Sequence, residues 1–227
     1  MGKAKMHKIR GIDSFPNVFQ NEHFSNPVLK NYEGKIVDLK GKWAGEVFKN
    51  QNPVVLELAC GKGDYTLALA QKYPNKNFIG VDSKGARIYT GSKTAIEAGL
   101  KNVAFVRLKI ENILNFFAPG EVSEIWITFP DPFPKKGDAK RRLTAPAFLE
   151  RYKQICRPGA TIHFKTDDLP LFHFTKEMID TTGRKCLYYR ENIYSAPLES
   201  EELEIKTYYE KKHLEDGRTI NYLSFQI

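Results

Sequence analysis

Short apolar runs alternate along the chain with segments of helical periodicity. Runs of β-branched and aromatic residues bounded by turn-forming residues are typical of buried strands, whereas apolar positions three and four apart are typical of helices. The pattern predicts strands over 53–59, 77–83, 102–108, 124–129, 161–165, 185–190 and 219–227. It predicts helices over 64–73, 84–98, 145–156 and 168–182, a short helix or turn at 113–117, and helix caps at Asp64 and Thr144.

This alternation predicts the fold class. Strand–helix–strand units build mostly parallel sheets with right-handed crossovers, so we expect a doubly wound α/β domain. The closing strand follows the short loop EDGR rather than a helix, which favours an antiparallel placement. Residues 1–50 lack clear periodicity apart from a short helix near 41–49, and we interpret them as a basic N-terminal extension ahead of a domain spanning 51–227.

Composition narrows the class of protein. The 227 residues, 41% hydrophobic and 27% charged, are typical of a soluble globular chain with one α/β core. No apolar run is long enough to cross a bilayer and no apolar stretch follows the basic start, so we expect a cytoplasmic protein without a membrane contact. Cys60, Cys156 and Cys186 have neither CxxC nor Cys/His metal spacing, which predicts reduced thiols and no metal site. A monomer and a homodimer both remain open.

The positive charge is clustered. The net charge is +8, and Lys135, Lys136, Lys140, Arg141 and Arg142 fall within eight residues. A charge run is usually a solvated face, but clustered Lys and Arg also suit a polyanionic partner such as nucleic acid, and arginine can contact phosphate through two parallel bonds.

Acidic residues and glycines collect where predicted strands end. Glu57 lies late in the first strand of the domain, and Gly61 and Gly63 form the turn into a helix. The dinucleotide fingerprint is incomplete because Thr66 stands at its third glycine, and no P-loop is present, so a simple tight turn competes with a ligand site. Asp82 ends the next strand, where a carboxylate could hold a ribose diol.

Glu111 and Asn112 follow the third strand of the domain, near the expected position of a base. Carboxyl ends of parallel strands meet at one edge, where open α/β sheets bind ligands. The three strand ends together therefore predict a ligand with a cationic head, a ribose and a base.

ELACGKG, with VD at the next strand end and the downstream acid, resembles the S-adenosyl-L-methionine site of Rossmann-like class I methyltransferases. The resemblance implies that Glu57 and the Gly61–Gly63 turn lie near the methionine part of that cofactor. It implies that Asp82 holds the ribose and that Glu111 or Asn112 lies near the adenine.

FPDPFPKKGDAKRRL, residues 129–143, places one carboxylate between prolines at the end of a predicted strand. Proline fixes its own φ and restricts the preceding residue, so Asp131 is expected to be a rigid carboxylate at the pocket, over the cofactor. A preorganised acid there could serve catalysis, or the prolines could simply shape a loop.

This stretch, together with HFKTDD at 163–168 and IKTYYEKK at 205–212, resembles the bacterial tRNA (guanine-N7)-methyltransferases. The resemblance implies methyl transfer to N7 of a guanosine in the variable loop of tRNA, with Asp131 as the catalytic aspartate. It implies substrate contacts at Lys135, Asp167, Thr207 and Glu210, beside the basic residues Lys140, Arg141 and Arg142.

Guanine N7 carries a lone pair and no proton, so this reaction needs alignment rather than a strong base. Asp131 or Asp167 could accept hydrogen bonds from the guanine edge, and the sequence does not separate them. Two other functions compete: a methyltransferase for a small molecule, and a non-enzymatic RNA-binding protein. Tyr188, Tyr189, Tyr208 and Tyr209 could stack on bases, but we interpret them as core residues, because tyrosines in strand-like runs are mostly buried.

Overall fold

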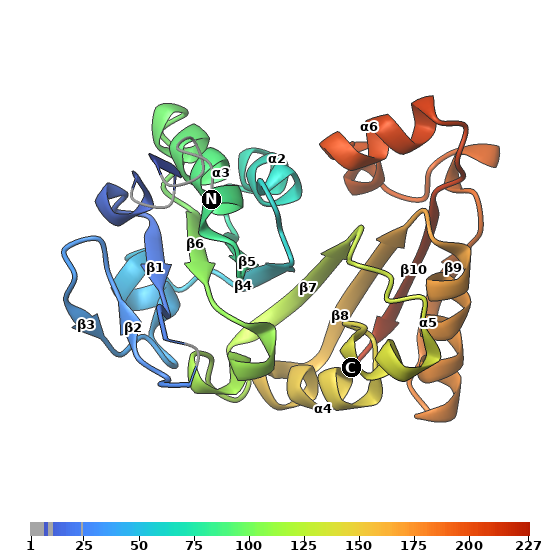
Figure 1. The fold of residues 1–227 in the computed structure, drawn as a ribbon, viewed down its shortest axis with the longest axis horizontal. Helices are drawn as coiled ribbons and strands as arrows, with labels where there is room; N and C mark the ends of the chain where they lie inside the picture. Colours follow the sequence, from blue (N-terminus) through green and yellow to red (C-terminus); the bar gives the residue numbers. More distant parts are fainter. Residues whose placement is uncertain (1–6, 9–10, 24) are drawn as a thin grey trace.

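In a computed structural model, which describes residues 7–8, 11–23 and 25–227, ten strands form one mixed sheet with helices on both faces (Figure 1). The strands are β1 (Val18–Gln20), β2 (Leu29–Lys30), β3 (Ile36–Val37), β4 (Val54–Leu58), β5 (Asn77–Asp82), β6 (Val103–Arg107), β7 (Val122–Thr128), β8 (Cys156–Thr166), β9 (Cys186–Arg190) and β10 (Asn221–Gln226). The α-helices are α2 (Asp64–Lys72), α3 (Gly85–Glu97), α4 (Pro146–Ile155), α5 (Leu169–Thr181) and α6 (Tyr208–Glu215). Shorter helical turns are η1 (Ile12–Ser14), η2 (Trp43–Val47), η3 (Ile110–Asn115), η4 (Lys136–Arg141), η5 (Ile193–Ser195) and η6 (Glu201–Glu204).

The strand order confirms the doubly wound fold. The sheet runs β3-β2-β1-β6-β5-β4-β7-β8-β10-β9, and the strands from β6 to β8 are parallel. The order of connection reverses between β4 and β7, which makes their carboxyl ends the switch point where such sheets bind ligands. β10 pairs antiparallel with both β8 and β9, as its short preceding loop predicts.

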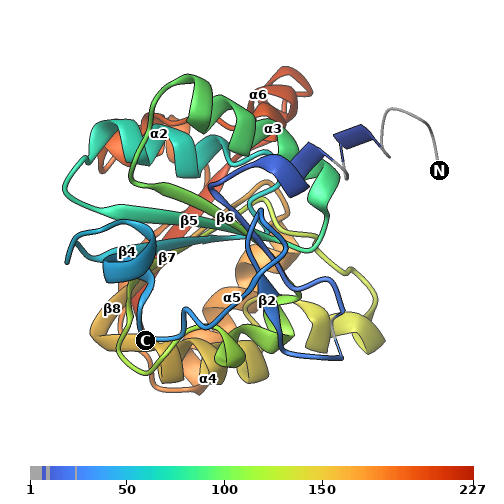
Figure 2. The same cartoon turned by 90° about the vertical axis from the view of Figure 1, so that its left-hand side faces the viewer.

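Each face of the sheet has its own hydrophobic cluster. α2 and α3 cover one face, with α6 on the same side, while α4 and α5 cover the other (Figures 1 and 2). β4 is buried along its whole length because helices lie on both sides of it, and this explains its continuous apolar run. No helix within the described ranges is long and apolar enough to cross a membrane.

The described residues between 11 and 49 are packed against the sheet, although their sequence lacks clear periodicity. β1 pairs parallel with β6, and β2 and β3 extend the edge. Trp43 is fully buried, stacks on Phe117 with ring centroids 5.4 Å apart, and donates its indole N–H to the carbonyl of Phe116 at 2.9 Å. Residues 1–6, 9–10 and 24 of the expected extension lie outside the described residues, and a boundary at residue 50 stays a prediction.

Both helix caps expected from the sequence are wrong. Asp64 is the first residue of α2, whose N-cap is Gly63, and its carboxylate instead accepts the backbone N–H of Tyr208 at 2.8 Å. Thr144 is buried, and its hydroxyl lies 2.8 Å from that of Thr175, so it joins two elements rather than capping α4.

Candidate active site at the switch point

Glu57 is a buried carboxylate at the end of β4. Its Oε2 accepts the backbone N–H of Thr66 at 2.8 Å and the Thr66 hydroxyl at 2.5 Å, and its Oε1 accepts the Thr128 hydroxyl at 3.1 Å. Burial raises the pKa of Glu57 to about 7, although these hydrogen bonds oppose the effect. A cationic ligand group would restore the charged form, so the site suits an ammonium.

The turn after β4 requires its glycines. Gly63 has φ +75, and a Cβ there would lie 2.5 Å from the Phe105 ring. Gly61 has φ +58 and donates its N–H to Asp82 at 3.1 Å, while Lys84 donates its N–H to the other oxygen of that carboxylate at 2.8 Å. Burial raises the pKa of Asp82. The hydrogen bond from Gly61 to Asp82 thus joins the turn after β4 directly to the end of β5.

Two cavities lined by described residues open at this edge of the sheet. The Glu57 cavity, of about 300 Å³, is bounded by β4, the loop after β7, and the start of α6. The Asp82 cavity, of about 210 Å³, is bounded by the ends of β5 and β6 together with η3, and has apolar walls at Leu108, Ile110 and Phe148. Ala59, Arg87 and Asp131 line both cavities, so the two are neighbouring parts of one crevice.

This crevice fits a ligand with a cationic head, a ribose and a base. Glu57 offers a carboxylate in the first cavity, Asp82 offers one at the start of the second, and the apolar walls beyond suit a base. Glu111 lines the Asp82 cavity, whereas Asn112, on the same turn, is not among its described lining residues.

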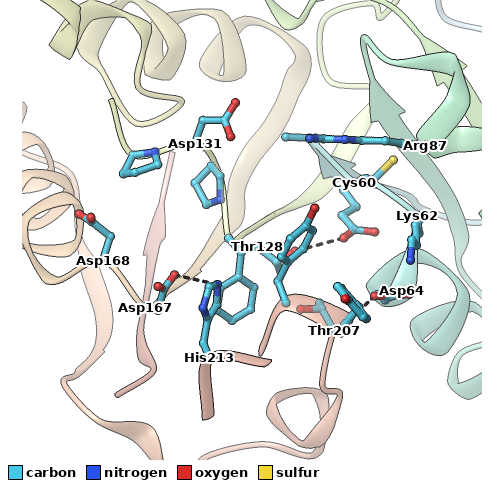
Figure 3. A pocket seen from close by; sticks show the side chains of 18 of the residues that line it. Cys60, Lys62, Asp64, Arg87, Thr128, Asp131, Asp167, Asp168, Thr207 and His213 are labelled. Carbon is cyan, nitrogen blue, oxygen red and sulfur yellow. Dashed lines mark hydrogen bonds and ion pairs between the residues drawn. The ribbon is translucent and has the colours of Figure 1, made fainter. Parts of the chain in front are cut away.

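Asp131 stands at the junction of the two cavities on a loop that is held firmly. Phe129 and Phe133, each followed by proline, have φ values of +49 and +45, which non-glycine residues rarely adopt. The N–H of Phe129 donates to the carbonyl of Lys165 at 2.8 Å. Figure 3 shows Asp131 and Arg87 among the residues that line the Glu57 cavity.

The basic cluster divides into two groups. The Arg142 guanidinium is half-buried, donates to the carbonyls of Pro132 and Phe133, and lies 4.4 Å from the Phe174 ring centroid. It therefore holds the Asp131 loop. Lys135, Lys140 and Arg141 are exposed, with Arg141 over the Phe133 ring and lining the Asp82 cavity.

Of the three predicted substrate-contacting residues in the C-terminal part of the chain, two line the Glu57 cavity and one does not. Asp167 lines the Glu57 cavity, where its carboxylate accepts Arg218 at 2.8 Å and lies 3.6 Å from His213 (Figure 3). Thr207 lines the same cavity and caps α6 by accepting the Glu210 N–H at 3.0 Å. Glu210 itself has no exposed surface and does not line either cavity.

Several lining residues were missed by the sequence analysis. Tyr208 and Tyr209 are 54% and 48% exposed and line the Glu57 cavity from α6, so interpreting them as core residues was wrong. The Lys62 ammonium lies 4.5 Å from the Tyr208 ring centroid. Arg87 and His213 also line the cavity. The signal for the tyrosines was their place directly after the helix cap Thr207, which brings them to the rim.

Among the described residues, no group of three or more His, Cys, Asp or Glu side chains is arranged to hold a metal ion.

Comparisons with known proteins agree with this architecture. Residues 51–223 match the family model described as "Putative methyltransferase". The tRNA (guanine-N(7)-)-methyltransferase of Bacteroides fragilis is 46% identical over 99% of this chain and 86% of its own length, and that of Christiangramia forsetii is 45% identical over 99% and 98%. The Bacillus subtilis enzyme of the same name is 34% identical over 81% of this chain and 84% of its own.

Among solved structures, the 16S rRNA methyltransferase KamB shares the fold, with a TM-score of 0.64 at 16% identity over 85% of this chain and 96% of its own. At that identity the likeness concerns the fold alone. The matches to the Bacteroides fragilis and Christiangramia forsetii enzymes each cover 99% of this chain and so include the strand ends and the loop that carry the crevice. The chain belongs to the tRNA (guanine-N(7)-)-methyltransferase family.

Proposed function

We propose that this protein transfers a methyl group from S-adenosyl-L-methionine to N7 of a guanosine in the variable loop of tRNA, forming 7-methylguanosine. The observation that carries the proposal is that Asp131 lines both the cavity that contains Glu57 and the cavity that contains Asp82. The reaction itself comes from family membership. The proposed compartment is the cytoplasm.

Different residues of the crevice would bind different parts of the cofactor. Glu57 and the Gly61–Gly63 turn would hold its methionine part, Asp82 its ribose, and Glu111 with the apolar walls its adenine. When bound, S-adenosyl-L-methionine supplies a methyl group on a positively charged sulfur, which a nucleophile can take directly. The buried carboxylate of Glu57 would compensate positive charge in a place that water reaches poorly.

Guanine N7 needs no base to become a nucleophile, so the task of the protein is to hold the base in line. Asp131 is exposed at the junction and could accept hydrogen bonds from the N1–H and exocyclic amine of guanine, which adenine does not offer in that arrangement. The Asp167 carboxylate is already bonded to Arg218, so we assign it the positioning of that guanidinium at the rim.

The rim of the crevice suits a polynucleotide. Lys135, Lys140 and Arg141 are exposed beside the Asp131 loop and would contact phosphates. Tyr208 and Tyr209 present half-exposed rings at the Glu57 cavity, where an extracted base or its neighbour could stack.

Methyl transfer can be tested with labelled cofactor and unmodified tRNA, followed by borohydride and aniline cleavage at 7-methylguanosine. We expect label in tRNA and cleavage in the variable loop. Asp131→Asn should lower kcat by tenfold or more, because the loss of a positioned acidic group typically slows a reaction by at least that factor. The control Asp180→Asn, which changes an exposed ion pair with Lys176 on α5, should have the kcat of the wild type. Label without cleavage at a guanosine, or full activity of Asp131→Asn, would contradict the assignment.

Salt dependence separates this function from methyl transfer to a small molecule. Binding of tRNA releases counterions and should weaken steeply as salt rises, whereas turnover of a small neutral substrate should change little. A flat salt response of KM would favour the small-molecule enzyme.

A further inference from the structure

Lys165 is a fully buried lysine near the end of β8, two residues before Asp167. Neither its side chain nor that of Glu210 has exposed surface, and its ammonium lies 2.7 Å from Glu210 Oε1. Both side chains are absent from the described lining of the two cavities. This ion pair therefore cannot contact substrate directly, and its role must be sought in what it holds.

On one side the pair holds the chain that forms the α6 wall of the Glu57 cavity. The Lys165 ammonium also donates to the carbonyls of Leu203 and Ile205 at 3.2 and 3.3 Å, just before the cap Thr207. Glu210 Oε1 accepts the Tyr194 hydroxyl at 2.6 Å, while the Glu210 N–H is bound by Thr207. The position of Thr207 and of the tyrosines after it thus depends on the buried pair.

On the other side Lys165 holds the Asp131 loop through its main chain. Its carbonyl accepts the N–H of Phe129, the left-handed residue that turns the chain from β7 into Pro130 and Asp131. The ammonium lies 3.1 Å from the Tyr65 hydroxyl of α2, the helix that follows the Gly61–Gly63 turn. One residue therefore contacts three segments that surround the Glu57 cavity.

Burying a lysine is costly, and an apolar pair of similar volume is often as stable as a buried ion pair. Desolvation lowers the pKa of Lys165, and the nearby Glu210 carboxylate opposes that effect. What an apolar pair would not reproduce is the set of directed bonds to the two carbonyls before Thr207. The ammonium therefore contributes hydrogen bonds that fix the position of the chain before Thr207, rather than net stability.

We propose that Lys165, paired with Glu210, is a positioning residue that fixes the α6 wall of the Glu57 cavity relative to the Asp131 loop. This inference rests on the proposed function. It also gives Glu210 an indirect role, in place of the substrate contact implied by sequence resemblance.

The test uses Lys165→Met, Glu210→Gln and the double variant in the full-length protein, with Lys176→Met as the control in an exposed ion pair. Assays run at a temperature where each variant is folded by circular dichroism, and kcat and KM are measured separately for tRNA and cofactor. We expect the double variant to recover thermal stability relative to the single variants while kcat stays at least tenfold below wild type. The cofactor KM should rise by less than kcat falls, because the Asp82 cavity, which would hold the ribose and the adenine, is not touched.

Recovery of both stability and kcat in the double variant would overturn the proposal, since the pair would then serve stability alone. If the single or double variants do not fold, Tyr194→Phe removes one bond to Glu210 and leaves both charges. We then expect faster hydrogen exchange at 207–211 and a kcat reduced severalfold, and unchanged exchange and kcat would refute the idea. Absence of tRNA methylation by the wild type would instead refute the proposed function.

Discussion

Replacing Glu57 by glutamine should make the unliganded protein more stable at high pH while weakening cofactor binding. Glu57 is 4% exposed, and burial raises its pKa from 4.5 to about 7. The folded chain thus binds this proton more tightly than the unfolded chain, so stability falls as pH rises from 4.5 through 7. The change in pKa corresponds to about 3 kcal/mol, which is lost in full above pH 7.

Glutamine retains the hydrogen bonds of the protonated acid. Its carbonyl can accept from Thr66, and its amide can donate to the Thr128 hydroxyl, which can rotate to accept. We therefore expect the stability difference between Glu57→Gln and wild type to grow by about 3 kcal/mol between about pH 4.5 and about pH 8.5. Urea denaturation of both proteins across this range measures it, and the other titrating groups cancel in the difference.

The same substitution should weaken cofactor binding at high pH, although it makes the unliganded protein more stable there. If the Glu57 carboxylate compensates an ammonium, the wild type must lose its proton to bind well. The ratio of wild-type to Glu57→Gln affinity should then rise about tenfold between pH 6 and about pH 8, following the ionised fraction of a group with pKa about 7. Calorimetric titrations supply both affinities. A stability difference that is constant with pH would show that Glu57 does not carry a desolvated charge, and the reasoning would fail.

Further predictions concern the turn and the basic cluster. Gly99→Ala, with φ +67 and open space, should lose about 1–3 kcal/mol in thermal melts through backbone strain alone. Gly63→Ala, with φ +75, should cost more than Gly99→Ala, because its Cβ would also meet the Phe105 ring. Lys140→Gln should reduce the slope of log tRNA affinity against log salt by about 0.9 if that exposed lysine contacts a phosphate, and an unchanged slope would remove it from the interface. Arg142→Lys should lower kcat with an unchanged salt slope, because the guanidinium holds loop carbonyls rather than phosphate.

The central sheet could be predicted from sequence because its strands are buried on both faces. The apolar run 53–59 corresponds to β4, and the short loop before the last strand correctly predicted an antiparallel β10. β2 and β3 could not be predicted, since strands of two residues exist only through pairing with neighbours. α6 was missed because the helix buries Glu210, so its interior face does not appear apolar in the sequence.

Candidate site residues were easiest to identify from the sequence where they lie at the ends of parallel strands. Glu57 and Asp82 lie at the ends of the parallel strands β4 and β5, and Asp131 follows the parallel strand β7. The topology brings such strand ends together. His213 and Arg218 come from α6 and the loop before β10, and they meet Asp167 only through tertiary packing. Arg142 was expected to contact phosphate because the sequence shows the charge of its side chain. The sequence does not show that the guanidinium donates hydrogen bonds to the carbonyls of Pro132 and Phe133.

Strained backbone at the switch point explains how a flat sheet edge becomes a crevice. Ala59, directly after β4, has φ +57, and Phe129, directly after β7, has φ +49. Left-handed conformations at such residues cost about 1–3 kcal/mol each and persist only where surrounding bonds enforce them. The N–H of Phe129 is held by Lys165, and the next N–H after Ala59, that of Cys60, is held by Val81 at 3.0 Å. Two adjacent parallel strands therefore turn sharply at the same level of the sheet. Because these turns direct the chain away from the strand axis, the edge between β4 and β7 stays open, and Asp131 can stand between the two cavities.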